Sequence, residues 1–172
     1  MATTNFLSPI EFKFVLSRLP SVEFFVQAVN IPGASSGFSE FPTPFKILYE
    51  PGDKLMYDDL VVTVLCDENL EAFKEIQAWI VALTYPDNFG QYRTLTTRPP
   101  GGVNTADVVN TIRSDASLIL LDSNKNASIQ LKFKDMFPTA ISGINLNTAG
   151  TDVTAPTFDI TFKYASYDIE VM

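Results

Sequence analysis

The stretch Tyr57-Asp58-Asp59-Leu60-Val61-Val62-Thr63-Val64-Leu65-Cys66 is followed, after Asp67-Glu68-Asn69, by an amphipathic segment from Leu70 to Leu83. Every residue from Leu60 to Cys66 is apolar or β-branched, which predicts a strand, and two apolar faces predict a strand covered on both sides. The second segment predicts a helix, because its apolar residues recur at helical spacing. We expect that face to be Leu70, Phe73, Ile76, Ile80 and Leu83.

The turn between the two segments carries a helix-start signal. Asp67 can accept a hydrogen bond from an otherwise unpaired helical N–H, so we expect it to cap the helix. The helix should then dock its apolar face on a sheet, with each large buried side chain contributing about 1.5–3 kcal/mol. Trp79 lies near this face, and we interpret it as a packing residue rather than a sugar platform.

Length and composition bound the class of protein. The 172 residues predict one domain, residues 1–172, and 46% hydrophobic with 19% charged residues indicate a globular chain. No apolar run approaches the ~20 residues of a membrane-spanning helix, so no membrane insertion is expected, and the N-terminal residues do not resemble a signal peptide. The net charge of −8 disfavours tight nucleic-acid binding, but it would suit a surface that DNA passes without adhering.

Catalytic and metal-binding patterns are weak. The chain has no histidine and one cysteine, Cys66, which excludes an internal disulfide and His-based catalysis. The neighbouring carboxylates Asp58 and Asp59 would point to opposite faces of a strand, and Gly101-Gly102 does not follow a strand as a phosphate-binding loop would. We therefore expect no enzyme, no cofactor and no metal site, and we expect Cys66 to be a small core residue.

The N-terminal part predicts several strands. Residues 10–16 alternate as a half-buried strand with Ile10, Phe12, Phe14 and Leu16 facing in, and residues 22–29 form a second strand that should pair with the first in a hairpin. Residues 34–44 are small, polar and proline-containing, which indicates a surface loop. Residues 45–57 predict a hairpin whose turn is Glu50-Pro51-Gly52-Asp53.

The hairpin at residues 45–57 has two interpretations that the residues alone do not separate. Its side chains are too apolar to stand in water, so it either folds onto its own sheet or docks on a neighbouring subunit. The apolar members are Phe45, Ile47, Tyr49, Leu55 and Tyr57.

The C-terminal half begins with a long irregular insertion, residues 84–115, within which residues 108–112 are a strand or a turn. Residues 117–121 and 127–133 predict a hairpin with its turn at residues 122–126. The chain should leave the sheet at residues 136–138, and residues 146–156 indicate a polar loop. The last strand, from residue 157, changes alternation between Tyr164 and Tyr167, which predicts a bulge or bend at Ala165-Ser166.

Three stretches resemble the tail tube proteins of T4-like contractile bacteriophages. They are Ala28 to Gly33, Gly52 to Glu68 with the following helix and its Trp79, and Ile129 to Pro138 with the terminal strand Thr157 to Ile169. The resemblance implies a mainly β fold with one helix (α+β), a β-sandwich or partial barrel flanked by the helix. It further implies a homohexameric ring with a continuous inner β-barrel, and helical assembly of stacked rings into the inner tube of a contractile tail.

The same resemblance implies a structural virion protein that serves as the conduit for DNA ejection. Its partners would be other copies of itself, the tail sheath protein, the tape measure protein, the baseplate tube initiator and the tail terminator, assembled in the host cytoplasm. The hairpin would reach the adjacent ring with Glu50 to Lys54 at its tip, and Asp159 would face the lumen. The inter-ring candidates are Phe45, Ile47, Tyr49, Glu50, Pro51, Gly52, Asp53, Lys54, Leu55 and Tyr57.

Other functions remain open at the level of sequence. A baseplate tube-initiating subunit shares this fold and would form one ring that does not polymerise. The tube of a phage-like contractile injection device would differ in carrying no DNA. A carbohydrate-binding β-sandwich, a different class, would stay monomeric and would need an exposed aromatic platform.

Overall fold

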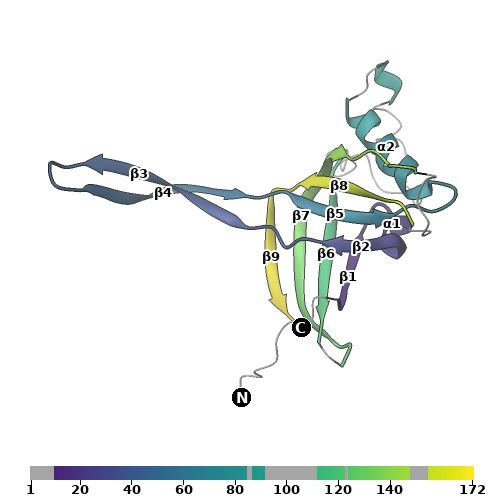
Figure 1. Cartoon of the computed structure of the whole chain (residues 1–172), viewed down its shortest axis with the longest axis horizontal. Coiled ribbons are helices and arrows are strands. Elements are labelled where there is room, and N and C mark those ends of the chain that lie inside the picture. The colour runs from purple at the N-terminus through teal and green to yellow at the C-terminus, as the bar shows by residue number, and fades with distance from the viewer. Residues whose placement is uncertain (1–9, 85–86, 92–111, 123, 148–154) are drawn as a thin grey trace, which may run out of the picture.

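The computed structural model of the protein describes residues 10–84, 87–91, 112–122, 124–147 and 155–172. Two antiparallel sheets share one long strand, a helix packs against them, and a two-stranded arm projects from the body (Figure 1). The elements are β1 (Phe12–Leu16), α1 (Pro20–Phe25), β2 (Val26–Val29), β3 (Ala34–Pro42), β4 (Ile47–Tyr57), β5 (Leu60–Leu65), α2 (Glu71–Thr84), β6 (Ser114–Leu121), β7 (Ala127–Ile141), β8 (Thr157–Lys163) and β9 (Ser166–Val171).

The shared strand is β7, which has 15 residues. Residues 127–136 pair with β6 and residues 129–134 also pair with β9, whereas residues 137–141 pair with β8. We call β1-β6-β7-β9 sheet A and β2-β5-β8-β7 sheet B. The prediction that the chain leaves the sheet at residues 136–138 is wrong, because β7 instead crosses there from sheet A into sheet B.

The predicted strand after Tyr57 is confirmed as β5, between β2 and β8 in sheet B. Leu60, Val62 and Val64 are fully buried. The alternate residues, Val61, Thr63 and Leu65, are only half-buried. The expectation that both faces are covered is therefore wrong for the single chain, since one face of sheet B is open.

The predicted helix is confirmed as α2, but the residues on its buried face differ from the predicted ones. Ala72, Ile76, Trp79 and Ala82 are buried. Phe73, Ile80 and Leu83 pack at the rim of the core instead. The indole of Trp79 explains this, because so large a ring takes the central place, 6.4 Å from the ring of Phe162. Its Nε1–H donates to the Ile112 carbonyl at 3.0 Å.

The start of α2 lies one residue later than the sequence indicates. Leu70 precedes the helix with a φ of 53°. An Oδ atom of Asp67 accepts a hydrogen bond from the backbone N–H of Glu71 at 3.1 Å. Asp67 therefore satisfies a free helical N–H as expected, although it stands four residues before the donor rather than at the N-cap.

The predicted N-terminal hairpin does not form. β1 pairs with β6, about a hundred residues away, and β2 pairs with β5. Between them lies the short helix α1, which begins at Pro20, where a fixed φ suits the first helical turn. Ile10 does not face inward, since 82% of it is exposed.

The hairpin that follows is longer than predicted and its turn lies elsewhere. Residues 34–44 are not a loop, because Ala34–Pro42 is strand β3 and pairs with β4. The turn is Thr43 to Lys46, closed by the Thr43 Oγ atom, which accepts from the backbone N–H of Lys46 at 3.1 Å. Pro51 and Gly52 lie inside β4, at a shift in register.

The C-terminal predictions are mostly confirmed. The β6–β7 hairpin turns at residues 122–126, where Asp122 Oδ1 accepts from the backbone N–H groups of Asn124 and Asn126. The predicted bend after Tyr164 separates β8 from β9. Most of the 84–115 insertion, including residues 108–111, and residues 148–154 of the polar loop lie outside the described residues. Among the helices described, none is long and apolar enough to cross a membrane.

Candidate assembly surfaces

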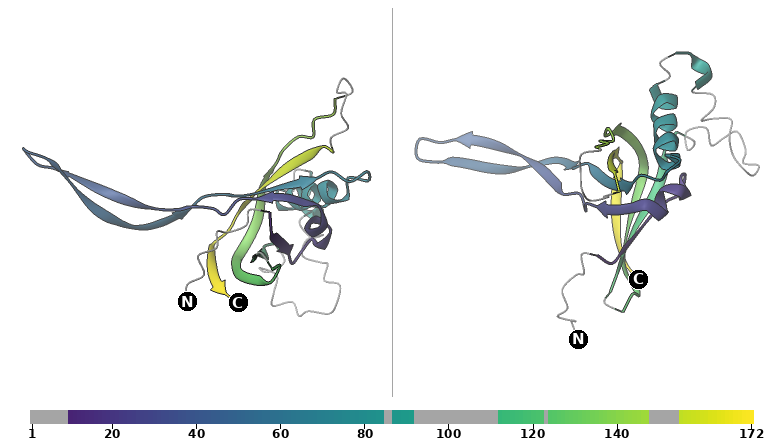
Figure 2. Two further views of the ribbon diagram at one scale, coloured as in Figure 1. Left: turned by 60° about the horizontal axis from the view of Figure 1, so that its bottom comes forward. Right: turned by 45° about the vertical axis from the view of Figure 1, so that its right-hand side comes forward.

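The most exposed element is the pair β3 and β4, residues 34–57, which we call the arm. It extends away from both sheets in every view (Figures 1 and 2). Phe45 at its turn is 98% exposed, Phe38 65% and Tyr49 63%. The alternative in which this hairpin folds onto its own sheet is therefore wrong.

One face of the arm is mostly apolar. Residues opposite one another on antiparallel strands share a face. Phe38 and Tyr49 are diagonal neighbours on this face, and their rings meet edge-on at 5.6 Å. An exposed and mostly apolar surface of this kind indicates an interaction surface. The cross-strand pairs that form the face are Pro42 with Ile47, Glu40 with Tyr49, Phe38 with Pro51, Ser36 with Leu55 and Ala34 with Tyr57.

The ten predicted contact residues lie at different distances along the arm, from its turn to its junction with the body. Glu50 to Lys54 are not the tip, because they lie in mid-strand beside the register shift, and the tip is Thr43 to Lys46. Ile47, Tyr49, Pro51, Leu55 and Tyr57 share the apolar face. The sequence prediction did not include Phe38 and Phe41 of β3, which are also exposed. The signal that could have identified them is the presence of two phenylalanines in an otherwise polar stretch. The role of all these residues in an inter-ring contact stays a prediction.

A cluster of aromatic rings packs at the root of the arm, which is its junction with the body at Tyr57. Tyr57, the last residue of β4, lies 5.6 Å from the ring of Tyr164 and 5.3 Å from that of Tyr167. Phe133 of β7 contacts both of these tyrosines, at 5.2 and 5.7 Å. The bend between β8 and β9 is therefore packed directly against the end of the arm.

Two hydroxyl groups of this cluster bind the backbone at the root. Tyr164 Oη donates to the Asp58 carbonyl at 2.9 Å, and Tyr167 Oη donates to the Pro32 carbonyl at 3.3 Å. Burial, with the neighbouring tyrosines and Asp58, raises the pKa of Tyr164 to about 12. The phenol therefore stays protonated, and can keep donating its hydrogen bond, into the pH range where a free phenol has lost its proton.

The open face of sheet B contains the predicted lumen residue. Asp159 is exposed, and its Oδ1 accepts from Thr63 Oγ1 at 2.7 Å. Lys163 on the same face is ion-paired with Asp59. The remaining side chains are uncharged, so the face has two carboxylates, Asp59 and Asp159, against the one ammonium of Lys163 and is weakly acidic. Its residues are Ala28, Val61, Thr63, Leu65, Asp159, Thr161 and Lys163. That Asp159 faces a lumen stays a prediction.

Sheet B has an unpaired strand edge on each side. Within the described residues, β2 pairs only with β5, and residues 137–141 of β7 pair only with β8. Unpaired edges leave backbone N–H and C=O groups that can bind a further strand.

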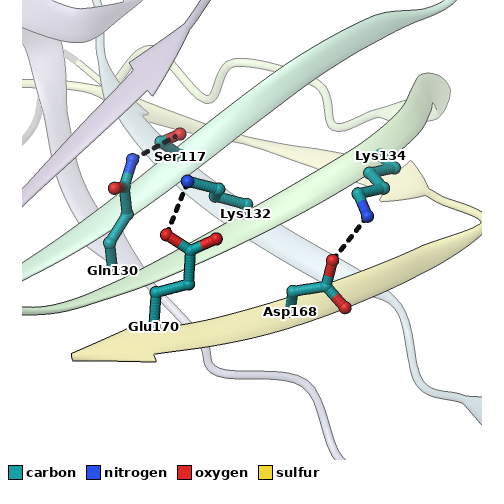
Figure 3. A network of polar contacts seen from close by, with 6 residues as sticks. All are labelled: Ser117, Gln130, Lys132, Lys134, Asp168 and Glu170. Atoms are coloured by element: carbon teal, nitrogen blue, oxygen red, sulfur yellow. Dashed lines mark hydrogen bonds and ion pairs between the residues drawn. The ribbon is translucent and has the colours of Figure 1, made fainter.

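The outward face of sheet A is polar and internally paired (Figure 3). Lys132 Nζ lies 2.6 Å from Glu170 Oε2, and Lys134 Nζ lies 2.5 Å from Asp168 Oδ2. The hydrogen bond to Asp168 raises the pKa of Lys134. Solvent screens exposed pairs of this kind, so they neutralise the charge of the face more than they stabilise the fold.

The described residues offer few candidate sites for catalysis or metal binding. The described part of the chain holds no group of three or more His, Cys, Asp or Glu residues placed to bind a metal ion. Burial, and then Asp67, raise the pKa of the Cys66 thiol, which disfavours the reactive thiolate. A shallow polar hollow of about 540 Å³ opens beside Arg18, Arg113 and Asp115. The features that stand out are therefore unpaired strand edges and an exposed apolar arm, and these define a β protein built for assembly with other chains.

The comparisons with known proteins agree with this class. The family model described as phage tail tube protein matches residues 11–170. The chain belongs to the phage tail tube protein family, and its role is a structural one in a tail tube. It is accordingly a component of a virion or of a phage-tail-like particle. The comparison with curated proteins finds no significant match.

Solved structures share the fold at low sequence identity. A chain of the anti-feeding prophage (AFP) baseplate has a TM-score of 0.63 and 8% identity, with 99% of this chain and 97% of that chain covered. A chain of the AFP tube-terminating cap has a TM-score of 0.60 and 10% identity, covering 100% and 95%. A chain of the PVC sheath-tube complex, from an extracellular contractile injection system, has a TM-score of 0.56 and 10% identity, covering 99% and 95%.

Proposed function

We propose that six copies of this chain close into a ring through sheet B, and that the rings stack into the inner tube of a contractile tail. The observation that carries the proposal is the pair of unpaired edges on sheet B, β2 on one side and residues 137–141 of β7 on the other. Pairing β2 of one copy with β7 of the next satisfies both edges at once. The similar AFP baseplate structure is 6-fold symmetrised, which supports the number six.

In such a ring the open face of sheet B, with Asp159, lines the lumen. The face is weakly acidic and the chain carries a net charge of −8, so phosphate backbones find no basic residues in excess to bind. A duplex can then move through without adhering, which is what a conduit for DNA ejection requires. The proposed role is structural and includes no catalysis.

In this proposal the arm makes the contact between stacked rings. Its apolar side chains are exposed to water in the single chain, which is unfavourable, and packing them against an adjacent ring buries them. The proposed partners beyond the chain itself are the sheath, the tape measure protein, the baseplate initiator and the terminator, with assembly in the host cytoplasm. The similar chains in a sheath-tube complex, a baseplate and a terminating cap support this set in part.

The test compares the full-length protein with an arm-shortened variant. Residues 38–51 are replaced by Asn-Gly, because Gly37 and Gly52 lie in contact across the arm and a short turn can join them. Negative-stain microscopy at high concentration should show tubes for the full-length chain and single rings for the variant.

Each other outcome bears on a different step. Normal tubes from the shortened chain would contradict stacking by the arm. A full-length protein that remains a single ring would favour the baseplate initiator. A full-length protein that stays monomeric would contradict closure through sheet B and favour the carbohydrate-binding class.

A further inference from the structure

The exposed large apolar side chains of the described chain are concentrated in two places. Most lie on the arm, and a second group lies in the last four residues, where Ile169 is 61% exposed, Val171 83% and Met172 67%. The arm group is Phe38, Phe41, Phe45, Ile47, Leu48, Tyr49, Leu55 and Met56.

The second group continues the core layer of sheet A. Three apolar rows cross its four strands in register, and the members on β1, β6 and β7 are buried or half-buried. The members on β9 become steadily more exposed, from half-buried Tyr167 to Val171. The rows are Leu16-Ala116-Phe133-Tyr167, Phe14-Leu118-Leu131-Ile169 and Phe12-Leu120-Ile129-Val171.

The apolar layer therefore extends beyond what the described chain covers. We call Ile129, Ile169, Val171 and Met172 the C-terminal corner. The backbone here is regular, since the Met172 N–H donates to the Ser128 carbonyl at 3.0 Å and continues the ladder of β7 and β9.

The other face of β9 needs no partner. Asp168 and Glu170 alternate with the exposed apolar residues and are already paired with Lys134 and Lys132 (Figure 3). In the part of the chain that the structure describes, β9 pairs only with β7, so its outer edge is also free. One strand thus combines a satisfied polar face, an uncovered apolar face and an open backbone edge.

We propose that the C-terminal corner receives the arm of a second copy of this chain. The inference rests on the proposed function, in which the arm contacts an adjacent ring, and it adds the surface that the arm meets. The arm does not cover its own corner, because both remain exposed in the same chain and leave the body in different directions (Figure 1). A contact between two different surfaces of one chain propagates from copy to copy, as a stacked tube requires.

The first test uses two double variants on opposite faces of β9. Ile169→Asp with Val171→Asp places charges on the receiving surface, and the matched control Asp168→Ser with Glu170→Ser alters only the paired polar face. We expect rings from the first, with tube yield lower by at least about tenfold, as one lost apolar contact can give. The control should form tubes. Both pairs are exposed, so the thermal midpoint should stay near that of the parent.

The second test maps the contact directly in a Cys66→Ser background. A chain with Val171→Cys is mixed with chains bearing Tyr49→Cys or Leu55→Cys, and with a Glu68→Cys control placed before α2. Disulfide-linked pairs on a non-reducing gel should form with an arm position and not with Glu68→Cys.

The outcomes separate this inference from the proposed function. Normal tubes from the Ile169→Asp, Val171→Asp variant, or no link to either arm position in tubes that do form, would overturn the receiving surface and leave the tube intact. A further chain carries both Phe6→Cys and Val171→Cys; an internal disulfide in that chain, without a link from Val171→Cys to either arm position, would assign the corner to the chain's own N-terminal segment and also overturn the receiving surface. Failure of the parent chain to form rings would instead contradict the proposed function.

Discussion

Gly52 and Gly37 face each other across the arm, and we expect substitution by alanine to strain the arm at Gly52 but not at Gly37. A methyl group at Gly52 would lie 2.6 Å from the carbonyl oxygen of Gly37 and 2.8 Å from its carbonyl carbon. These are backbone atoms, so the strands must separate. A methyl group at Gly37 meets nothing within 4 Å. The Gly52→Ala variant therefore strains the arm, and the Gly37→Ala variant is its matched control.

The magnitude follows from ordinary overpacking, which costs about 1–3 kcal/mol. A two-stranded ribbon is only marginally stable alone, so this cost is enough to disorder the arm beyond the register shift. The arm contacts the body through Tyr57, which lies on the body side of the register shift. The strained segment beyond the shift makes no part of that contact, so the free energy of unfolding of the body should change by less than about 0.5 kcal/mol.

The assay has two readouts. Tube length and number are counted by negative-stain microscopy, and the body is followed by the fluorescence of Trp79, the one tryptophan of the chain, during urea unfolding. Gly52→Ala should give rings with few tubes and an unchanged unfolding curve, and Gly37→Ala should match the parent in both. Equal polymerisation by the two variants, or a larger defect in Gly37→Ala, would refute the reasoning.

Two further predictions concern the body. Trp79→Ala should lower the free energy of unfolding by about 3–5 kcal/mol, as buried aromatic truncations do, whereas Phe45→Ala at the exposed tip should change it by less than about 0.5 kcal/mol; chemical denaturation followed by circular dichroism measures both. Because the folded pKa of Tyr164 is about 12 against 10.0 for a free phenol, the unfolded chain releases this proton first, and stability should fall as pH rises from 10 to about 12. Tyr164→Phe should show a shallower fall over that window in the same titration, and an identical fall would contradict the assignment.

Local signals in the sequence predicted much of the body. The strand β5, the helix α2 and the β6–β7 hairpin each carry their pattern within a short window, and the change in alternation after Tyr164 located the bend. The pairing of β1 with β6 could not be predicted in this way. It joins residues about a hundred positions apart, and nothing local distinguishes it from the nearer hairpin with residues 22–29.

The arm was misread for a different reason. Strand β3 is exposed on both faces, so burial imposes no alternation on it, and its serines and glycine gave the composition of a loop. Pro51-Gly52 is a strong turn signal, but here the glycine permits close approach of two backbones. The candidate contact residues therefore lie in the exposed arm, but the sequence placed its tip at Glu50 through Lys54 instead of Thr43 through Lys46.

The continuity of β7 has a mechanical consequence. One uninterrupted backbone runs through sheet A and into sheet B, so the two layers cannot slide or hinge apart without bending that strand and breaking its ladders. A load that reaches β7 through the ladder with β9 in sheet A is passed along the covalent backbone of β7 into the ladder with β8 in sheet B. Each copy should thus behave as a stiff element under the thrust of a contracting tail, and any compliance of the assembly should arise between copies.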